Sequence, residues 1–399
     1  MKGFLKFISI SGTVILCILL LLSVCVLPSF IEFPKGEEST DPSDSLPPTP
    51  TESEEKTEEP TEPETPPESE EPKEYITVDG EALGIVDVSK VKYGYSEMVD
   101  DIEKLSNKYS DKMSYSVIGS SHDGRNLYAI TLGSPDADKQ IIVSAGIHGR
   151  EYLTPLLVMK QLEFYLYNYE TAEYGGIPFS QIFEEYQFCI LPMCNPDGVT
   201  LSQFGIGAIR SIELKDTIRA IYESDKSRGY TSDSLDKYLH YWKANARGVD
   251  LNRNFDTSDW SELAYVSVPS FRNYKGESRL SEPETKAMAD YVNSLSNPVL
   301  SLAIHSQGKI IYFDCGQEDA QPSLKLAQSI SQLSGYKIDY ESRRDAAFDD
   351  WCIMSKGIPS VTVETGDYDV TEPLQLWQFK LIWTATRDLW VHVAAEYMN

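Results

Sequence analysis

Short apolar runs alternate with helically spaced apolar residues from about residue 75 to the C-terminus. Uninterrupted apolar runs indicate buried strands, whereas apolar residues that recur every three or four positions indicate amphipathic helices. The first pattern predicts strands at residues 113–118, 127–132, 140–147, 187–193, 299–304, 310–313 and 360–364. The second pattern predicts helices at residues 95–112, 155–166, 283–295, 322–334 and 374–397.

The alternation of strands with helices predicts an α/β fold in which helices cover both faces of one sheet. The last helix, 374–397, is amphipathic, and its tryptophans and leucines are expected to close the core. Residues 201–245 are polar and irregular, which predicts a long loop region with short helices. In sheets of this class active sites form at strand ends, so polar residues that follow the apolar runs are candidate functional groups.

The first 31 residues form a separate apolar segment. An uncharged, mostly apolar run extends from Phe7 to Ile31 and follows Lys2 and Lys6. It is long enough to span a bilayer and longer than the core of an ordinary signal peptide. We therefore expect a membrane anchor at residues 1–31, the alternative being a cleaved signal segment and a secreted protein. The lysines favour a cytoplasmic N-terminus and an extracellular remainder.

Residues 32–75 contain ten of the 22 prolines of the chain, together with many Glu, Ser and Thr residues. Their 16 acidic and 3 basic side chains give this segment a net charge of −13, nearly half of the total of −27. Such a composition cannot bury a core, so we expect an extended, self-repelling linker. The folded part is then expected at residues 76–399, as a single domain.

The charge and the cysteines exclude two classes of function. The chain is acidic and has no cluster of Lys and Arg, which argues against nucleic acid as a partner. No Cys-x-x-Cys pair occurs, which argues against a cysteine-based zinc site. The spacing leaves open the disulfide state of the four cysteines in the folded part, Cys189, Cys194, Cys315 and Cys352.

The predicted strand 140–147 is followed directly by His148-Gly-Arg-Glu151. Thr154 and Pro155 then suit the N-cap and the first position of the next helix. The three-residue spacing lets His148 and Glu151 point to one place. An imidazole nitrogen and a carboxylate oxygen are two of the three protein ligands that a catalytic zinc ion uses, with water in the fourth position.

The third ligand can be sought among the five histidines of the chain. His122 lies in a predicted hairpin turn, His240 in the polar loop region and His392 in the last helix, and a structural role is expected for each. His305 alone shares with His148 the position just after an apolar strand. His148, Glu151 and His305 are therefore the predicted ligands of one Zn²⁺ per chain.

A hydrolytic zinc site also needs a base and groups that orient the ligands. Glu364 is the last residue of another predicted strand, 360–364, and is the candidate general base. Asp250 lies in a cluster of polar residues and could accept the second ring proton of His148, which would fix the tautomer of that imidazole.

Five segments, in this order along the chain, resemble motifs of the zinc carboxypeptidases of the carboxypeptidase A type. They are His148-Gly-Arg-Glu151, Asn195-Pro-Asp-Gly198, Gly248-Val-Asp-Leu-Asn-Arg-Asn254, Ile304-His-Ser306 and Thr362-Val-Glu364. The resemblance extends from about residue 90 to residue 399. It implies a mixed, mostly parallel twisted sheet in a single catalytic domain, and a monomer is expected.

The same resemblance implies roles for individual residues. His148, Glu151 and His305 would hold the zinc ion, and Glu364 would act first as general base and then as general acid. Asn252 and Arg253 would bind the carboxylate of the departing residue, and Arg150 would be a secondary substrate contact.

Two positions depart from the animal enzymes. The arginine that polarises the scissile carbonyl usually follows a tryptophan, but here Lys243 follows Trp242, and Arg247 lies nearby. The oxyanion role therefore stays open between Lys243 and Arg247. The tyrosine that closes over the substrate has no clear counterpart, although Tyr340 lies at nearly the right distance before Asp350-Trp351.

The sequence from Trp242 to Phe255 and the segment His305-Ser-Gln-Gly308 are similar to those of a bacterial branch of the family. Enzymes of that branch hydrolyse γ-D-glutamyl-diamino acid bonds in peptidoglycan stem peptides. By the same resemblance, Asp349 would form the floor of the pocket for the departing side chain, with Arg343 close by. An acidic floor favours an amine and an arginine favours a carboxylate. Diaminopimelate carries both groups, so a γ-D-glutamyl bond to diaminopimelate is the predicted substrate.

Three other functions are compatible with these motifs. A broad carboxypeptidase that scavenges extracellular peptides would use the same fold and site. A catalytically inactive module that binds the cell wall would be expected to lack a ligand or the base, and neither is missing. An amidase or deacylase that acts on acylated amino acids is the third alternative, although such relatives are usually shorter and cytosolic.

Overall fold

The predicted strands assemble into one eight-stranded sheet. The computed structural model describes residues 84–263, 265–316, 320–368 and 372–398. The strand order in this part of the chain is β1-β2-β6-β3-β7-β10-β8-β9. The strands are β1 (Met113–Ser120), β2 (Asn126–Leu132), β3 (Lys139–Ala145), β6 (Tyr186–Leu191), β7 (Pro298–Ser306), β8 (Ile310–Tyr312), β9 (Lys337–Asp339) and β10 (Ser360–Thr365). A separate two-stranded ribbon pairs β4 (Glu173–Tyr174) with β5 (Ile177–Pro178).

The centre of the sheet is parallel. β3 pairs in parallel with β6 and with β7, and β7 pairs in parallel with β10. Three antiparallel pairs, β1–β2, β2–β6 and β8–β10, lie toward the edges. Strands buried on both faces need continuous apolar runs, which explains why these strands could be recognised in the sequence. The predicted mixed, mostly parallel sheet is confirmed.

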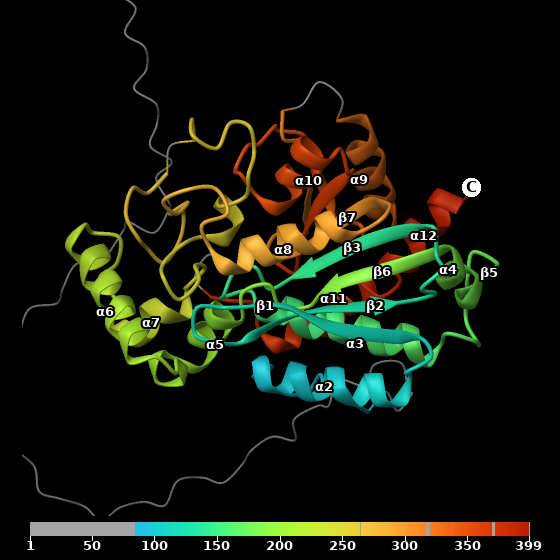
Figure 1. Cartoon of the computed structure of the whole chain (residues 1–399), viewed down its shortest axis with the longest axis horizontal. Coiled ribbons are helices and arrows are strands. Elements are labelled where there is room, and N and C mark those ends of the chain that lie inside the picture. The colour runs from blue at the N-terminus through green and yellow to red at the C-terminus, as the bar shows by residue number, and fades with distance from the viewer. Residues whose placement is uncertain (1–83, 264, 317–319, 369–371, 399) are drawn as a thin grey trace, which may run out of the picture. The chain divides into compact units, whose positions relative to one another are not determined.

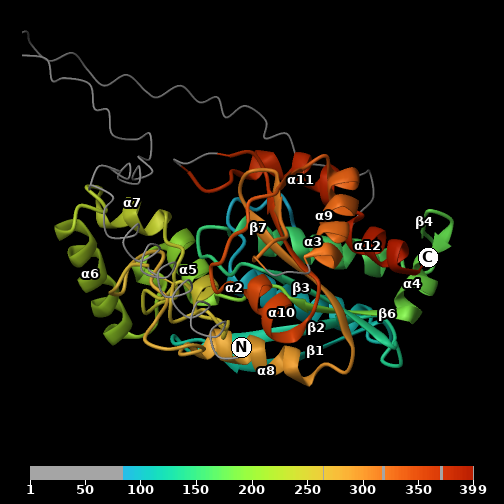
Figure 2. The same ribbon diagram turned by 90° about the horizontal axis from the view of Figure 1, so that it is seen from above.

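Helices cover both faces of the sheet (Figures 1 and 2). One face packs against α2 (Tyr95–Lys108), α3 (Leu153–Tyr167), α4 (Phe179–Glu185), α9 (Gln321–Ser334), α11 (Phe379–Thr386) and α12 (Leu389–Met398). The other face packs against α8 (Pro283–Ser294) and α10 (Phe348–Lys356). In β3, Ile141 and Val143 join the first core while Ile142 joins the second, as the two-residue period of a strand requires.

A third apolar cluster lies beside the sheet, at the left of Figure 1. It is built by α5 (Pro196–Phe204), α6 (Ile212–Ser227) and α7 (Leu235–His240). The prediction of a loop region with only short helices was wrong here, since α6 has 16 residues. Its buried residues Leu214, Ile218, Ile221 and Tyr222 have helical spacing, but polar residues between them obscure the pattern.

Helix boundaries differ from the prediction in three places. The first helix ends at Lys108 rather than at residue 112, because Tyr109 leaves helical geometry before the turn into β1. Helix α3 begins at Leu153 instead of after a Thr154 cap, and its N-cap residue, Tyr152, makes no capping hydrogen bond through its side chain.

The predicted helix 374–397 is interrupted between Thr386 and Leu389. Two side chains of α3 bind the carbonyls exposed at this break: Gln161 donates to the Thr386 carbonyl at 2.6 Å, and the Tyr165 hydroxyl donates to the Arg387 carbonyl at 2.5 Å. Carbonyls at the end of a helix need such partners when they are buried. The break therefore depends on tertiary contacts that spacing alone does not show.

None of the helices in the described part of the chain has both the length and the apolar character needed to cross a membrane. The predicted anchor at residues 1–31 and the predicted linker at residues 32–75 lie outside the described residues.

Replacing Asp225 in α6 by alanine should lower the free energy of unfolding by about 3 kcal/mol. Asp225 is fully buried and pairs with Arg228, and its Oδ2 accepts hydrogen bonds from the hydroxyls of Tyr238 and Ser270 and from the Phe271 amide. Alanine would leave these buried donors unsatisfied. Denaturant unfolding of the purified protein measures the change.

Asp216 provides a matched control on the same helix, since it forms an ion pair of the same i, i+3 spacing with Arg219 at 3.0 Å. Both side chains of this pair are largely exposed. Replacing Asp216 by alanine should therefore change the stability by less than about 0.5 kcal/mol. Equal losses in the two variants would contradict the role given to the Asp225 network.

Candidate active site and metal centre

The ends of three neighbouring strands bring the candidate residues together. β3 ends at Ala145, two residues earlier than predicted, and the loop that follows carries His148 and Glu151. His305 is the penultimate residue of β7 rather than the residue after a strand, and it pairs in register with Glu364 of β10. The parallel order β3-β7-β10 therefore places all four side chains at one edge of the sheet.

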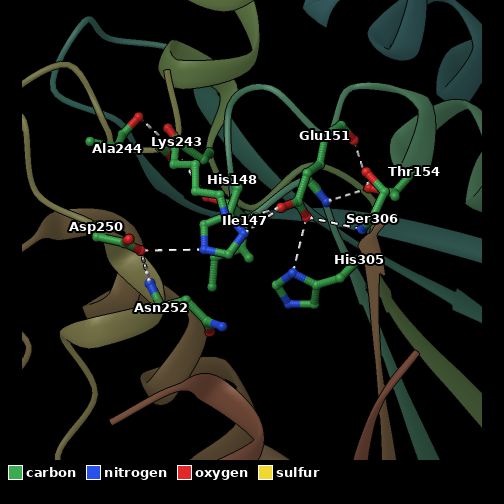
Figure 3. A network of polar contacts seen from close by, with 12 residues as sticks. Ile147, His148, Glu151, Thr154, Lys243, Ala244, Asp250, Asn252, His305 and Ser306 are labelled. Atoms are coloured by element: carbon green, nitrogen blue, oxygen red, sulfur yellow. Dashed lines mark hydrogen bonds and ion pairs between the residues drawn. The ribbon is translucent and has the colours of Figure 1, made fainter. Parts of the chain in front are cut away.

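His148, Glu151 and His305 form a compact, buried group (Figure 3). One potential ligand atom from each residue lies within 4.8 Å of the others. The Nδ1 atom of His148 is 2.7 Å from Oε1 of Glu151, and Nδ1 of His305 is 3.0 Å from Oε2 of the same carboxylate. Two Nδ1 atoms and one carboxylate thus converge on one place, which is the donor set of a catalytic zinc ion.

Asp250 lies beside His148, on the side of the imidazole that faces away from Glu151 (Figure 3). Its Oδ1 atom is 3.3 Å from Nε2 of His148, and the backbone amides of Asn252 and Asn273 donate to its two oxygens. A carboxylate in this position favours the proton on Nε2 and leaves the Nδ1 lone pair free to bind a metal. The residues present therefore fit a zinc ion.

Charges in this group support the same interpretation. Burial alone would raise the pKa of the Glu151 carboxyl, but the adjacent His148 and His305 hold that pKa well below its usual range. Burial alone would lower the pKa of His305, but Glu151 raises it above its usual value. Glu151 is therefore an anionic carboxylate between two imidazoles, as a cation site requires.

The loop that carries His148 is fixed to the loop that carries Lys243. The Asn195 side chain, which also caps α5, donates to the carbonyls of Ile147 and Ala244, each at 3.0 Å. The Gly149 amide donates to the Lys243 carbonyl at 3.0 Å. The Asn195-Pro-Asp-Gly198 motif therefore positions the site, a role that the sequence alone did not reveal.

A cavity of about 180 Å³ opens beside the metal-binding group. It includes both histidines of the group and is lined by residues from loops, strands and helices that are far apart in the sequence: His148, Lys243, Asn252, Arg253, His305, Tyr312, Phe313, Asp314, Cys315, Arg343, Asp345, Ala347, Asp349, Asp350, Ile353, Thr362 and Glu364. Acidic and basic side chains both contribute to this lining, so the cavity is suited to a ligand that carries charges of both signs.

Glu364 and Lys243 are two cavity residues for which the sequence predicted a catalytic role. Oε2 of Glu364 is buried and has no hydrogen-bond partner among the described residues. Burial and the negative charge of Glu151 raise the pKa of the Glu364 carboxyl. Burial and the nearby Arg150 lower the pKa of Lys243, whose Nζ atom lies 3.8 Å from Oε1 of Glu151.

Three of the residues predicted for catalysis or substrate binding do not line this cavity. Arg247 is exposed, so of the two cations left open for the oxyanion role only Lys243 lies in the cavity. Tyr340 is 66% exposed and instead packs against Phe313 on the cavity wall, with ring centroids 5.9 Å apart. Arg150 is partly buried and lies outside the cavity lining, but its positive charge lowers the pKa of Lys243.

Asn252 and Arg253 both line the cavity, and Arg253 is already paired with an internal carboxylate. Its Nη2 atom lies 3.4 Å from Oδ2 of Asp345. The Tyr265 hydroxyl donates to the other oxygen of Asp345 at 2.8 Å, and the Arg253 guanidinium lies over the Tyr265 ring. Sequence reasoning gave Asp345 no function, because nothing in its spacing connects it with a residue 92 positions earlier.

Asp349 and Arg343, the two residues predicted to lie near the departing side chain, both line the cavity. Burial raises the pKa of Asp349, and burial together with Asp349 raises the pKa of Asp350 to about 8. Arg343 is half exposed and pairs with Asp339 at 2.8 Å. Acidic and basic side chains therefore line the same pocket.

A comparison with protein families identifies this arrangement. Residues 98–380 match the family model described as zinc carboxypeptidase. The chain belongs to the zinc carboxypeptidase family. It is a peptide hydrolase of that family, and zinc is the cofactor to which its His2Glu group corresponds.

Individual relatives support the assignment. γ-D-Glutamyl-L-diamino acid endopeptidase 1 of Lysinibacillus sphaericus is 31% identical over 73% of this chain and 69% of its own length. Human mast cell carboxypeptidase A is 27% identical over 59% of this chain and 50% of its own length. Among solved structures, thrombin activatable fibrinolysis inhibitor aligns with a TM-score of 0.60 and 20% identity over 76% of each chain, which establishes the carboxypeptidase fold.

The four cysteines of this zinc carboxypeptidase domain are buried free thiols. Burial raises the pKa of Cys194 and of Cys315 to about 12. Thiols with such pKa values are poor nucleophiles. The cysteines therefore have a packing role, although Cys315 touches the cavity.

Proposed function

We propose that this chain hydrolyses the γ-D-glutamyl bond to diaminopimelate, or to a closely similar diamino acid, in peptidoglycan stem peptides. The observation that carries the proposal is the joint presence of Asp349 and Arg343 in the cavity beside the metal-binding group. A side chain that ends in both an amine and a carboxylate suits this pair of charges. The similarity to the endopeptidase of Lysinibacillus sphaericus supports the same substrate class.

In this proposal His148, Glu151 and His305 hold the zinc ion, and Asp250 fixes the tautomer of His148. When bound, the ion supplies a Lewis acid that activates water and polarises the amide carbonyl. The two imidazoles and the single carboxylate leave one net negative charge in the protein ligand set.

Glu364 is proposed to take the proton of the attacking water and to deliver it to the departing amide nitrogen. Its buried Oε2 atom is not engaged by any described residue and is therefore available for the transfer. Its raised pKa also suits both roles, because a carboxyl group with an ordinary pKa would release the proton too readily. Proton delivery is essential, since an amine anion is a poor leaving group.

Lys243 is proposed to stabilise the negative charge that develops on the carbonyl oxygen. Its replacement by alanine should lower kcat by about 10²–10³-fold, the usual effect of removing one oxyanion donor. Replacing the exposed Arg247 by alanine is the matched control and should leave kcat nearly unchanged. Steady-state kinetics, with the zinc content measured in parallel, decides which of Lys243 and Arg247 stabilises the oxyanion. A larger loss of kcat in the Arg247 variant would reverse the assignment.

Arg253 and Asn252 are proposed to contact the carboxyl end of the departing residue, and Arg150 to assist from outside the cavity lining. A substrate carboxylate that reaches Arg253 must displace or share the Asp345 carboxylate. Asp345 therefore weakens the attraction of this pocket for a simple terminal carboxylate. A diamino acid also brings an amine, which the neighbouring acidic residues attract.

The substrate assignment is tested by comparing kcat/KM for a muropeptide that contains γ-D-glutamyl-diaminopimelate with kcat/KM for a peptide that ends in phenylalanine. The wild-type protein should prefer the muropeptide. Replacing Asp349 by alanine should reduce muropeptide cleavage by about 10- to 150-fold, the effect of losing one hydrogen bond to a charged group, while zinc content is retained. Comparable cleavage of both substrates would instead support the broad carboxypeptidase function.

We also propose that the chain is exported and attached to the membrane through residues 1–31, where stem peptides are accessible. The support is the apolar run from Phe7 to Ile31 after two lysines. Fractionation should recover the full-length chain with membranes, with the folded domain sensitive to external protease. A soluble form that starts near residue 29 would indicate a cleaved signal segment.

A further inference from the structure

A second group of one histidine and two glutamates lies where the turn between β1 and β2 meets the beginning of α8. One ligand atom each from His122, Glu282 and Glu284 lies within 4.8 Å of the others. The Nε2 atom of His122 is 2.9 Å from Oε2 of Glu282. None of the three residues lines the catalytic cavity or belongs to the group of His148, Glu151 and His305, so this group is separate from the active site.

Glu284 is the unusual member of this group. It is 0% exposed, and its Oε1 atom has no hydrogen-bond partner in the described part of the chain. The nearest donor to its other oxygen is the Asn245 side chain, at 3.4 Å. Burial of a carboxylate with one oxygen unpartnered is unfavourable, so this side chain calls for a cation or a proton.

The arginines near this group do not balance the negative charge of its two glutamates. Arg125, the buried arginine of the same turn, is engaged by Asp123 and Asp197. Arg247, whose charge also acts on His122, is exposed and forms no ion pair with either glutamate among the described residues.

We propose that His122, Glu282 and Glu284 form a second metal site, which binds a divalent transition-metal ion. One imidazole nitrogen and two carboxylates are ligands that Zn²⁺ and Mn²⁺ accept. Neutral His122 with two carboxylates carries a charge of −2, which one divalent ion balances. The ion would take the place of the direct contact between His122 and Glu282.

Asn245 connects this second site to the loop between Lys243 and Asp250. Its Nδ2 atom donates to Oε2 of Glu282 at 2.7 Å, and its Oδ1 atom accepts from the amides of Arg247 and Val249. The loop ordered in this way carries Lys243 and Asp250 at its two ends. The ion is therefore inferred to stabilise the turn, the start of α8 and this loop as one unit.

The first test is the metal content of the full chain, stripped with a chelator and then equilibrated with Zn²⁺. The wild-type protein should bind two ions per chain, the His305→Ala and Glu284→Gln variants one each, and the double variant none. Mass spectrometry of the bound metal gives the count. One ion in the wild type together with none in His305→Ala would overturn the proposal.

His240 supplies a matched control, because it also faces a glutamate, Glu372, at 3.1 Å, but in a partly exposed position. The His240→Gln variant should still bind two ions. In the His305→Ala background, Zn²⁺ should raise Tm, since a ligand that binds only the folded state stabilises it. The Glu284→Gln change should abolish that rise. An equal rise in the double variant would also overturn the proposal.

Discussion

Glu364→Gln should retain its full zinc content while kcat falls by about 10³–10⁴-fold, the upper range for loss of a positioned general base. Glutamine has nearly the same size and can still accept a hydrogen bond, but it cannot take a proton from water at neutral pH. Because Glu364 is not a member of the His2Glu group, its loss should leave the metal in place. Turnover assays and metal analysis on the same preparation measure both quantities.

A suitable control for this experiment is Glu341→Gln, since Glu341 is exposed and lies outside the cavity lining. That variant should behave as the wild type. Substantial activity in Glu364→Gln would transfer the role of base to another carboxylate. Asp349 and Asp350 would then be the next candidates, because both line the cavity and burial raises the pKa of each.

His305→Ala should lose the catalytic zinc ion and with it nearly all activity, because only two of the three protein ligands would remain. The buried Glu151 would also lose one of the two imidazoles that it contacts. The loss of one ion per chain, measured with the chain at equilibrium with dilute Zn²⁺, is the expected result. His148→Ala should act in the same way.

The partly exposed His240 again serves as the control, since its replacement by glutamine should change neither catalysis nor metal content. A His305→Ala protein with unchanged zinc and turnover would contradict the proposed ligand set. Such a result would require another third ligand near His148 and Glu151, and the described residues offer none in that group.

The central strands were predictable because their residues are buried on both faces. β6 and β7 appear in the sequence as mostly apolar runs, whereas β10 alternates valines with polar residues. Helix α6 was not predicted as a long helix, because its buried residues contact α7 and neighbouring loops rather than the sheet, and its other positions are polar. The break between α11 and α12 depends on Gln161 and Tyr165 of another helix, so local spacing could not indicate it.

The residues of the metal-binding group were predictable for a related reason. His148 and His305 stand at the ends of apolar strands, and a parallel sheet brings such ends together. Arg247 and Lys243 are only four positions apart, so the sequence could not show that one side chain points to solvent and the other into the cavity. The pairing of Arg253 with Asp345 joins two loops, and only the folded chain reveals it.

Digestion of a defined muropeptide in water labelled with oxygen-18 tests most directly the claim that the chain hydrolyses the γ-D-glutamyl bond. The wild-type protein should cleave the γ-D-glutamyl bond to diaminopimelate, and mass spectrometry should find one heavy oxygen atom in the new γ-carboxylate of the glutamyl product. The Glu364→Gln protein, loaded with zinc, should release almost no such product. An intact muropeptide in the presence of active enzyme, with release of C-terminal phenylalanine from an ordinary peptide, would contradict the account.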